Sequence, residues 1–257
     1  MNISGLAGGT SVGYVGEVQN IPTTGVTFEQ KTLTWKKMAA LVPISNDLLR
    51  FSSPAADTIV RNDLVSSMAL REDIAFIRDD GTAHRPRGLF HWALPANRFA
   101  ADATTNLTTV TTDLGRAILR LKNAHVRFVR PGWLMTPRTE FYLLTVRDGN
   151  GNFAFRDEVL AGRLLGFPIG VTTQIPDNLG VGGNESEVYL VDFADAIIGE
   201  STQLLVDAST EAAYHNGTNV VAAFSLDQTV IRVIAQHDFA MRYPQSVAVI
   251  TGVRWGV

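Results

Sequence analysis

The clearest candidate for chemistry in this chain is the run Asp-Gly-Asn-Gly-Asn at residues 148–152. It places oxygen-bearing side chains at alternate positions, which is how a calcium-binding loop begins. Such a loop then requires a glycine and a bidentate glutamate, but the chain has Phe153 and Val159 at those two positions. We therefore interpret residues 148–152 as a turn-rich surface loop.

Other patterns of catalytic or metal-binding residues fail for equally specific reasons. Gly8 and Gly13 have the spacing of a phosphate-binding loop, but Tyr14 stands where that loop needs a lysine. Asp79 and Asp80 are adjacent carboxylates that could bind a cation weakly, although the sequence that follows indicates a turn that ends a helix. The chain has no cysteine, and its five histidines include no pair at metal-binding helical spacing. We predict no catalytic, cofactor-binding or metal-binding residues and no enzymatic activity.

The charge balance narrows the function further. The 257 residues include 22 Lys and Arg against 25 Asp and Glu, a formal net charge of -3, and a dedicated nucleic-acid-binding protein would show a basic excess. The first residues lack the basic and apolar regions of a signal peptide, and no apolar run approaches the ~18 residues of a membrane span. We expect neither a membrane protein nor one with a small-molecule substrate.

The elements that would position these residues begin with an extended segment. Residues 1–12 are small, Gly-rich and unpatterned, which predicts a flexible arm. Residues 14–15 and 26–35 are β-prone and flank a Pro-Thr-Thr-Gly turn signal, so we predict a hairpin within residues 13–37. A two-stranded hairpin with so little apolar surface is marginal alone, and we expect it to rest on something outside the subunit.

A buried strand and a long helix follow. The apolar run Met-Ala-Ala-Leu-Val predicts a strand over residues 37–44 that is buried on both faces. Ser53 as N-cap and Pro54 as the first helical residue then predict a helix over residues 54–78, because neither Gly nor Pro interrupts that stretch. Such a helix is long for a globular domain.

The remainder mixes helices and strands without a regular βαβ repeat, which indicates the α+β class. Thr112 is expected to cap a helix that begins at Asp113, after a mostly irregular stretch with a β-prone piece at residues 107–111. Further predicted helices cover residues 137–146 and 157–165, and predicted strands cover residues 133–135, 167–171, 187–192, 203–207, 228–242 and 247–252.

A series of short motifs in a fixed order resembles the major capsid proteins of tailed bacteriophages with the Hong Kong 97 fold. The first half carries Val15-Gly16-Glu17, Pro22-Thr23, Thr27-Phe28, Leu33-Thr34, Lys36-Lys37-Met38-Ala39, Val42-Pro43-Ile44-Ser45, Leu48-Leu49, Asp80-Gly81-Thr82 and Arg87-Gly88-Leu89. The second half carries residues 148–155, Leu165-Gly166-Phe167-Pro168-Ile169 and Asp238-Phe239-Ala240 followed by Pro244. The resemblance covers the chain from about Gly13 onward, and the ordered series is far more specific than any one motif.

The resemblance implies a structural subunit of an icosahedral shell built from hexamers and pentamers. It implies a short N-terminal arm at residues 1–12, an extended loop at 13–37, a peripheral domain at 38–112 with the spine helix at 54–78, an axial domain at 113–225, and strands at 226–257 that return to the peripheral domain. The residues expected to contact other subunits are Glu17, Pro22, Phe28, Trp35, Arg71, Arg78, Arg147, Asp148, Asn150 and Phe153.

Two departures from the family pattern matter. Only about a dozen residues precede the extended loop, where relatives usually carry a longer arm; a separate scaffold, proteolytic maturation, an internal start or a shortened chain would each account for this. The positions that cross-link covalently in the type member fall on Val18 or Ile21, Asp227 and Ile234, which cannot form the bond. We therefore expect a shell held together noncovalently.

The resemblance also implies partners and a location. The partners are further copies of the chain, packaged DNA bound without sequence specificity, and, where present, a scaffold, a portal and a maturation protease. The location is a virion head that is assembled in the cytoplasm of a bacterial host. The densest basic segment, with His84, Arg85 and Arg87, is either a solvated loop or a contact with an acidic neighbour or DNA. An encapsulin-like bacterial nanocompartment is the alternative, and a metal-dependent hydrolase is a remote one.

Overall fold

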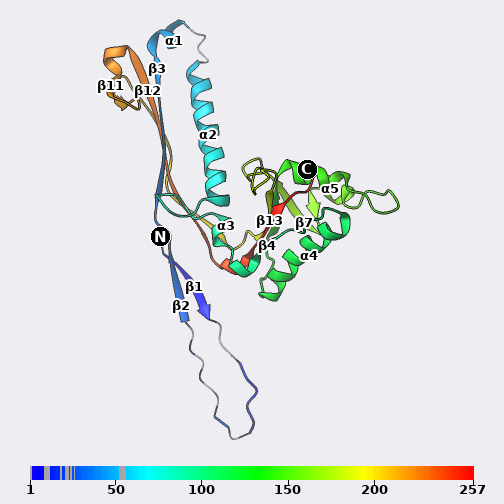
Figure 1. The fold of residues 1–257 in the computed structure, drawn as a ribbon. Helices are drawn as coiled ribbons and strands as arrows, with labels where there is room; N and C mark the ends of the chain where they lie inside the picture. Colours follow the sequence, from blue (N-terminus) through cyan, green and yellow to red (C-terminus); the bar gives the residue numbers. More distant parts are fainter. Residues whose placement is uncertain are drawn as a thin grey trace.

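The chain folds into an elongated molecule with three visible parts (Figure 1). In this computed structural model the described residues are 2–8, 12–17, 19–20, 23, 25, 27–51 and 56–257. A β hairpin projects at one end, an arm built on a long helix forms the other, and a body of helices around a sheet lies to the side. The mixture of helices and strands agrees with the predicted α+β class.

The projecting hairpin pairs strand β1 (Asn2–Gly8) with strand β2 (Thr27–Thr32) in antiparallel register. The prediction of an unpatterned arm over residues 1–12 was therefore wrong for Asn2–Gly8. Tyr14 and Val15, predicted as strand, lie outside any strand. Small residues with little β propensity still form a strand here because pairing along β2 satisfies their backbone N–H and C=O groups.

The arm is a three-stranded antiparallel sheet covered on one face by a long helix (Figure 1). Strand β12 (Gln228–Met241) lies in the centre, between β3 (Lys36–Ser45) and β9 (Ala196–Ser209). Helix α2 (Ala56–Arg78) packs Leu64 and Met68 against Ile231 and Val233 of β12. The predicted spine helix is thus present from Ala56, while its first residues, including Pro54, lie outside the described part of the chain.

Strand β3 differs from its prediction in burial. Exposed residues alternate with less exposed ones along most of the strand, so it is not buried on both faces. The reason is that α2 covers one face of the sheet: Ala40 and Val42 pack against its cluster, whereas Leu41 on the other face is 44% exposed.

The body holds a six-stranded mixed sheet with the largest hydrophobic core of the molecule. Its strands, in spatial order, are β4 (Arg98–Ala100), β13 (Val247–Val253), β8 (Ser186–Asp192), β5 (Pro131–Met135), β7 (Phe167–Val171) and β6 (Arg163–Leu164). Every residue of β8 is buried, as expected for a strand near the centre of a covered sheet. Trp133 and Leu190 are fully buried in this core together with Leu114 and Leu121 of helix α4.

Helix α4 (Leu107–Asn123) begins earlier than predicted. The Asn106 side chain accepts a hydrogen bond from the Thr109 backbone N–H, and the Thr109 hydroxyl accepts one from the Asn106 N–H. This reciprocal cap starts the helix, so the predicted strand at residues 107–111 and the predicted cap at Thr112 are both wrong. The β-branched threonines favour a strand, but the cap and the packing of Val110 into the core stabilise a helix instead.

The remaining elements are short connections. The arm ends in α1 (Asn46–Phe51), β10 (Ala213–His215), β11 (Val220–Ala222) and the 3-10 turn η2 (Ala223–Leu226), and the body adds α3 (Leu89–Trp92), η1 (Pro95–Asn97), α5 (Pro137–Thr145), α6 (Arg156–Leu160) and η3 (Pro244–Ser246).

The predicted boundary between residues 113–225 and 226–257 does not follow the sheets. Strand β9 falls in the predicted axial segment but pairs with β12 in the arm. Strand β13 falls in the predicted returning segment but lies between β4 and β8 in the body. Each part of the molecule is assembled from distant stretches of chain, which local sequence patterns cannot reveal.

Candidate interaction surfaces

The C-terminal end of helix α2 is held to the turn that follows it. Arg71 forms an ion pair with Asp79, with the arginine Nη2 2.6 Å from the carboxylate Oδ2. Gly88 returns against the end of the helix, where its N–H donates to the Asp79 carbonyl at 2.7 Å. A Cβ at Gly88 would lie 2.5 Å from the backbone nitrogen of Arg78, so only glycine fits here. This explains the Arg-Gly-Leu motif singled out in the sequence.

Arg78, the last residue of α2, ties the arm to the sheet of the body. Its Nη1 lies 2.7 Å from Oε2 of Glu187 in β8, whose side chain is 3% exposed. The Tyr189 hydroxyl donates to the same carboxylate oxygen at 2.6 Å. Burial, together with the charge of Glu187, raises the pKa of Tyr189 well above its usual value, so the phenol stays a neutral hydrogen-bond donor.

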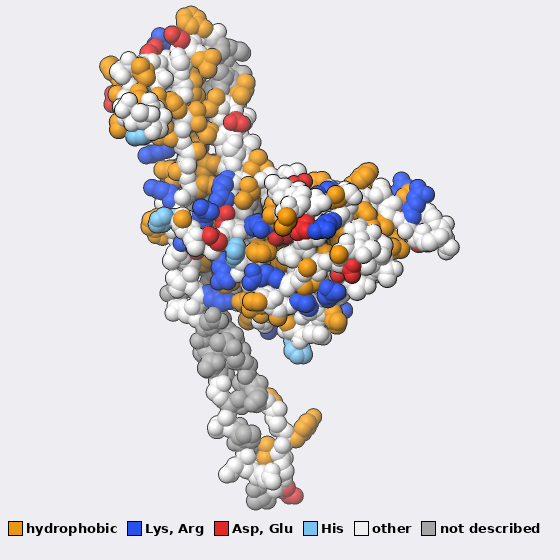
Figure 2. Space-filling view, in the orientation of Figure 1, with side chains coloured by type: hydrophobic (Ala, Val, Ile, Leu, Met, Phe, Trp, Pro, Cys, Tyr) orange, Lys and Arg blue, Asp and Glu red, His pale blue; other side chains and the backbone are white. Residues whose placement is uncertain are grey.

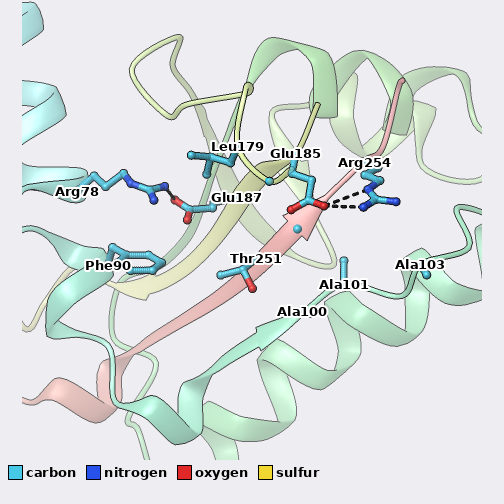
Figure 3. A pocket seen from close by; sticks show the side chains of 12 residues that line it. Arg78, Phe90, Ala100, Ala101, Ala103, Leu179, Glu185, Glu187, Thr251 and Arg254 are labelled. Carbon is cyan, nitrogen blue, oxygen red and sulfur yellow. Dashed lines mark hydrogen bonds and ion pairs between the residues drawn. The ribbon is translucent and has the colours of Figure 1, made fainter. Parts of the chain in front are cut away.

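A hollow of about 470 Å³ opens beside this ion pair (Figure 3). Across it from Arg78 and Glu187, the Glu185 carboxylate accepts hydrogen bonds from Nε and Nη2 of Arg254, at 3.2 Å and 2.6 Å. Sequence reasoning missed Glu185, Glu187 and Arg254. No signal in the sequence could have joined them to Arg78, because they come from segments far apart in the chain.

The four residues predicted for the loop between α5 and α6 do come together. Both Asp148 carboxylate oxygens accept hydrogen bonds from this loop: Oδ1 from the N–H groups of Asn150 and Asn152, at 2.9 Å and 2.8 Å, and Oδ2 from the Asn152 side chain. These bonds, the one from the Asn152 backbone foremost, lower the pKa of Asp148. The guanidinium groups of Arg147 and Arg156 lie 4.5 Å and 4.4 Å from the centre of the Phe153 ring. The loop is therefore an ordered, exposed projection that carries the guanidinium groups of Arg147 and Arg156 together with the carboxylate of Asp148.

The extended segment presents side chains to solvent. Glu17 is exposed, Val12 and Tyr14 are fully exposed, and Trp35 is 66% exposed near the root of the hairpin. Pro22 lies outside the described residues, and Phe28 is described only as part of strand β2. The structure thus brings Trp35 and Glu17 to the surface of one projection.

The far end of the arm carries exposed apolar side chains. Phe51, Leu48 and Phe224 are among the exposed large hydrophobic residues, on α1 and η2. Asp227 beside them accepts a hydrogen bond from the Asn46 side chain at 2.6 Å and lies 3.8 Å from the Arg50 guanidinium. This places Asp227, one of the cross-linking positions of the resemblance, at the arm tip, while Val18 and Ile21 fall outside the described residues.

Within the described ranges, no three His, Asp or Glu side chains gather in a way that could hold a metal ion. None of the helices in the described part of the chain is long and apolar enough to cross a lipid bilayer.

Comparison with known proteins gives consistent matches along the whole chain. The model of the phage capsid family matches residues 2–252. The chain is 41% identical over 257 residues to the major capsid protein of Klebsiella oxytoca phage phiKO2, a match that covers 98% of this chain and 60% of that protein. It is 29% identical to the capsid polyprotein of Pseudomonas phage PAJU2, covering 98% of this chain and 39% of the relative. The chain therefore spans less than two thirds of the length of either relative.

Solved structures share the fold at much lower sequence identity. A chain of Mycobacterium phage Cain superposes with a TM-score of 0.78 at 20% identity, covering 98% of this chain and 84% of that one. The capsid of a native GTA particle gives a TM-score of 0.77 at 16% identity, with the same coverage. These matches place the hairpin, the arm and the body in one known architecture.

Proposed function

The chain belongs to the phage capsid family, and on that premise we propose that it is the repeating structural subunit of an icosahedral phage head. Its architecture is the Hong Kong 97 fold that the ordered motifs indicated. The observation that carries the proposal is the 41% identity to a phage major capsid protein along 98% of this chain.

The surfaces support noncovalent assembly. The hairpin projects from the molecule and carries exposed apolar and aromatic side chains. Such side chains do not stabilise a free subunit, and they mark a surface for interaction. Copies arranged around closed symmetry axes would bury such projections repeatedly, which is how a single chain builds a shell. We assign the predicted contacts at Glu17, Trp35, Arg147 and Phe153 to these interfaces.

The finer proposals follow from the same premise. The copies form hexamers and pentamers, and the loop that contains Asp148 and Asn150 lies where they meet. The shell encloses DNA without reading its sequence and works with a scaffold, a portal and a maturation protease where the phage encodes them. The protein resides in the virion and assembles in the bacterial cytoplasm.

Shortening the projecting segment tests the proposal. Gly8 pairs with Thr27 in the β1–β2 hairpin, so residues 9–26 can be replaced by a tight turn that keeps both strands paired. The variant should remain folded, because the described residues in that stretch contribute nothing to the three buried clusters. We expect negative-stain microscopy to show particles for the natural chain and only free subunits or capsomers for the variant.

Two controls make the result decisive. The thermal midpoint of the shortened variant should match that of the natural chain, which separates a loss of assembly from a loss of folding. Particles that form normally without residues 9–26 would contradict the assigned role of the projection. Particles that carry protein cargo and show no nucleic-acid absorbance would instead favour the nanocompartment alternative.

A further inference from the structure

Five cations surround three aromatic rings of α3 and the edge strand β4. We call them the basic band: Lys31, Arg87, Arg98, Arg116 and Arg120. Figure 2 shows Lys and Arg side chains gathered on one face of the molecule between the arm and the body. We propose that the basic band binds the phosphate backbone of double-stranded DNA, an inference that rests on the proposed function and names the surface of the subunit that faces the packaged genome.

Aromatic rings hold the basic band in place. Lys31 and Arg87 lie over the Trp92 ring, with their charged groups 5.4 Å and 4.6 Å from its centre. Arg116 and Arg120 lie over Phe99 in the same way, at 5.0 Å and 4.4 Å. Arg98 lies 5.2 Å from the centre of Phe90. Each ring orients a cation without cancelling its charge.

Carbonyl groups hold two of the arginines as well. Nε and Nη2 of Arg87 donate to the His91 carbonyl, and Arg120 donates to the Ala96 carbonyl. Among the described residues, the ion pairs do not include Arg87, Arg98 or Arg120, whereas Arg116 lies 3.6 Å from the Asp113 carboxylate. Most of the positive charge is therefore held in position and left without a carboxylate.

His91 lies among these charged groups. Burial lowers the pKa of the His91 imidazole, and the charge of Asp80 opposes that change. The charges of Arg98 and Arg87 lower the pKa of His91 further, as nearby positive charges do. Charges of both signs therefore surround His91: the carboxylate of Asp80 and the guanidinium groups of Arg98, Arg87 and Arg78.

Phosphates fit this surface better than an acidic peptide does. A peptide partner needs apolar pockets to anchor its side chains, but the faces of Trp92 and Phe99 are already covered by cations. A guanidinium group presents a rigid fork of donors that matches phosphate oxygens, and several such groups around the edge of the sheet suit a continuous polyanion. The contacts expected are with the backbone only, so no sequence preference follows.

The test measures binding of the purified full chain to a short fluorescent DNA duplex of mixed sequence over a range of salt concentrations. The variant Arg98→Gln with Arg120→Gln removes two charges from the basic band. The variant Arg98→Lys with Arg120→Lys keeps both charges. The matched control, Arg127→Gln with Arg163→Gln, removes two charges from exposed positions elsewhere and gives the same net charge.

We expect the Gln pair in the basic band to lower the slope of log affinity against log salt by about 1.8, because each phosphate contact contributes about 0.9. The Lys pair and the control should keep the natural slope. If the Gln pair in the basic band and the Gln pair in the control lowered the slope equally, the inference would be overturned, because the loss would reflect net charge alone. So would unchanged DNA binding combined with failed assembly, because the band would then be a contact between copies.

Negative-stain microscopy of the same samples separates this inference from the proposed function. A natural chain that forms no particles refutes the shell assignment, whatever its affinity for DNA. Natural particles together with equal DNA binding by the Gln pair in the basic band and the control refute only the inference. A Lys pair that loses as much slope as the Gln pair would assign these arginines a structural role instead.

Discussion

At the scale of single residues, the Arg78–Glu187 ion pair is one of the contacts that attach the arm to the body. Glu187 is almost fully buried, whereas the Arg78 side chain is 31% exposed. Arg78→Met would leave the buried Glu187 carboxylate with only the Tyr189 hydroxyl as a described partner. Removing one partner of a fully buried ion pair lowers the free energy of unfolding by about 3–5 kcal/mol, which is an upper bound for this partly exposed pair. Glu187→Gln should cost less, because the amide oxygen can still accept from Tyr189 and from Arg78, whose side chain is partly exposed.

Urea unfolding of the two variants measures that order. We expect Arg78→Met to lower the free energy of unfolding more than Glu187→Gln does. Arg163→Gln, an exposed arginine without an assigned ion pair in the described residues, should change it by no more than about 0.5 kcal/mol. The reverse order would show that the ion pair does not bear on the attachment of the arm.

At the scale of elements, helix α2 is held to the arm sheet by a narrow line of contacts. Leu64 is 6% exposed and packs with Ile231 and Val233, whereas Ile59 on the same helix is 64% exposed. Leu64→Ala should therefore cost about 2–5 kcal/mol of stability in the free subunit. Ile59→Ala should stay within about 0.5 kcal/mol. Denaturant unfolding that gave equal losses would mean that the exposed side of α2 is buried in solution.

At the scale of the whole molecule, the arm and the body differ in how much of their surface is covered. Strand β8 is buried at every position, while β3 is an edge strand with alternating exposure. Exposed edges and uncovered faces open more readily than central strands. We expect amides of β3 to exchange faster than those of β8 in the free subunit and to become protected in particles, as measured by hydrogen-exchange mass spectrometry. Equal β3 exchange in both forms would argue against burial of the arm on assembly.

The sequence determined the elements with strong local signals. The uninterrupted helical stretch correctly predicted the last residue of α2. The alternation of turn residues with apolar runs predicted strands β3, β7 and β13 with bounds close to the observed ones. It also determined the family, because an ordered series of motifs is specific even when each motif is weak. Local backbone preferences and turn chemistry act between near neighbours, so they can be read along the chain.

Only the tertiary structure decided what depends on distant segments. It paired Asn2–Gly8 with Thr27–Thr32, placed β9 in the arm and β13 in the body, and joined Arg78 to Glu187. It also brought arginines from separate segments onto the rings of Trp92, Phe90 and Phe99. These features arise from contacts between residues far apart in the chain, whose free energy depends on the folded arrangement and leaves no local pattern.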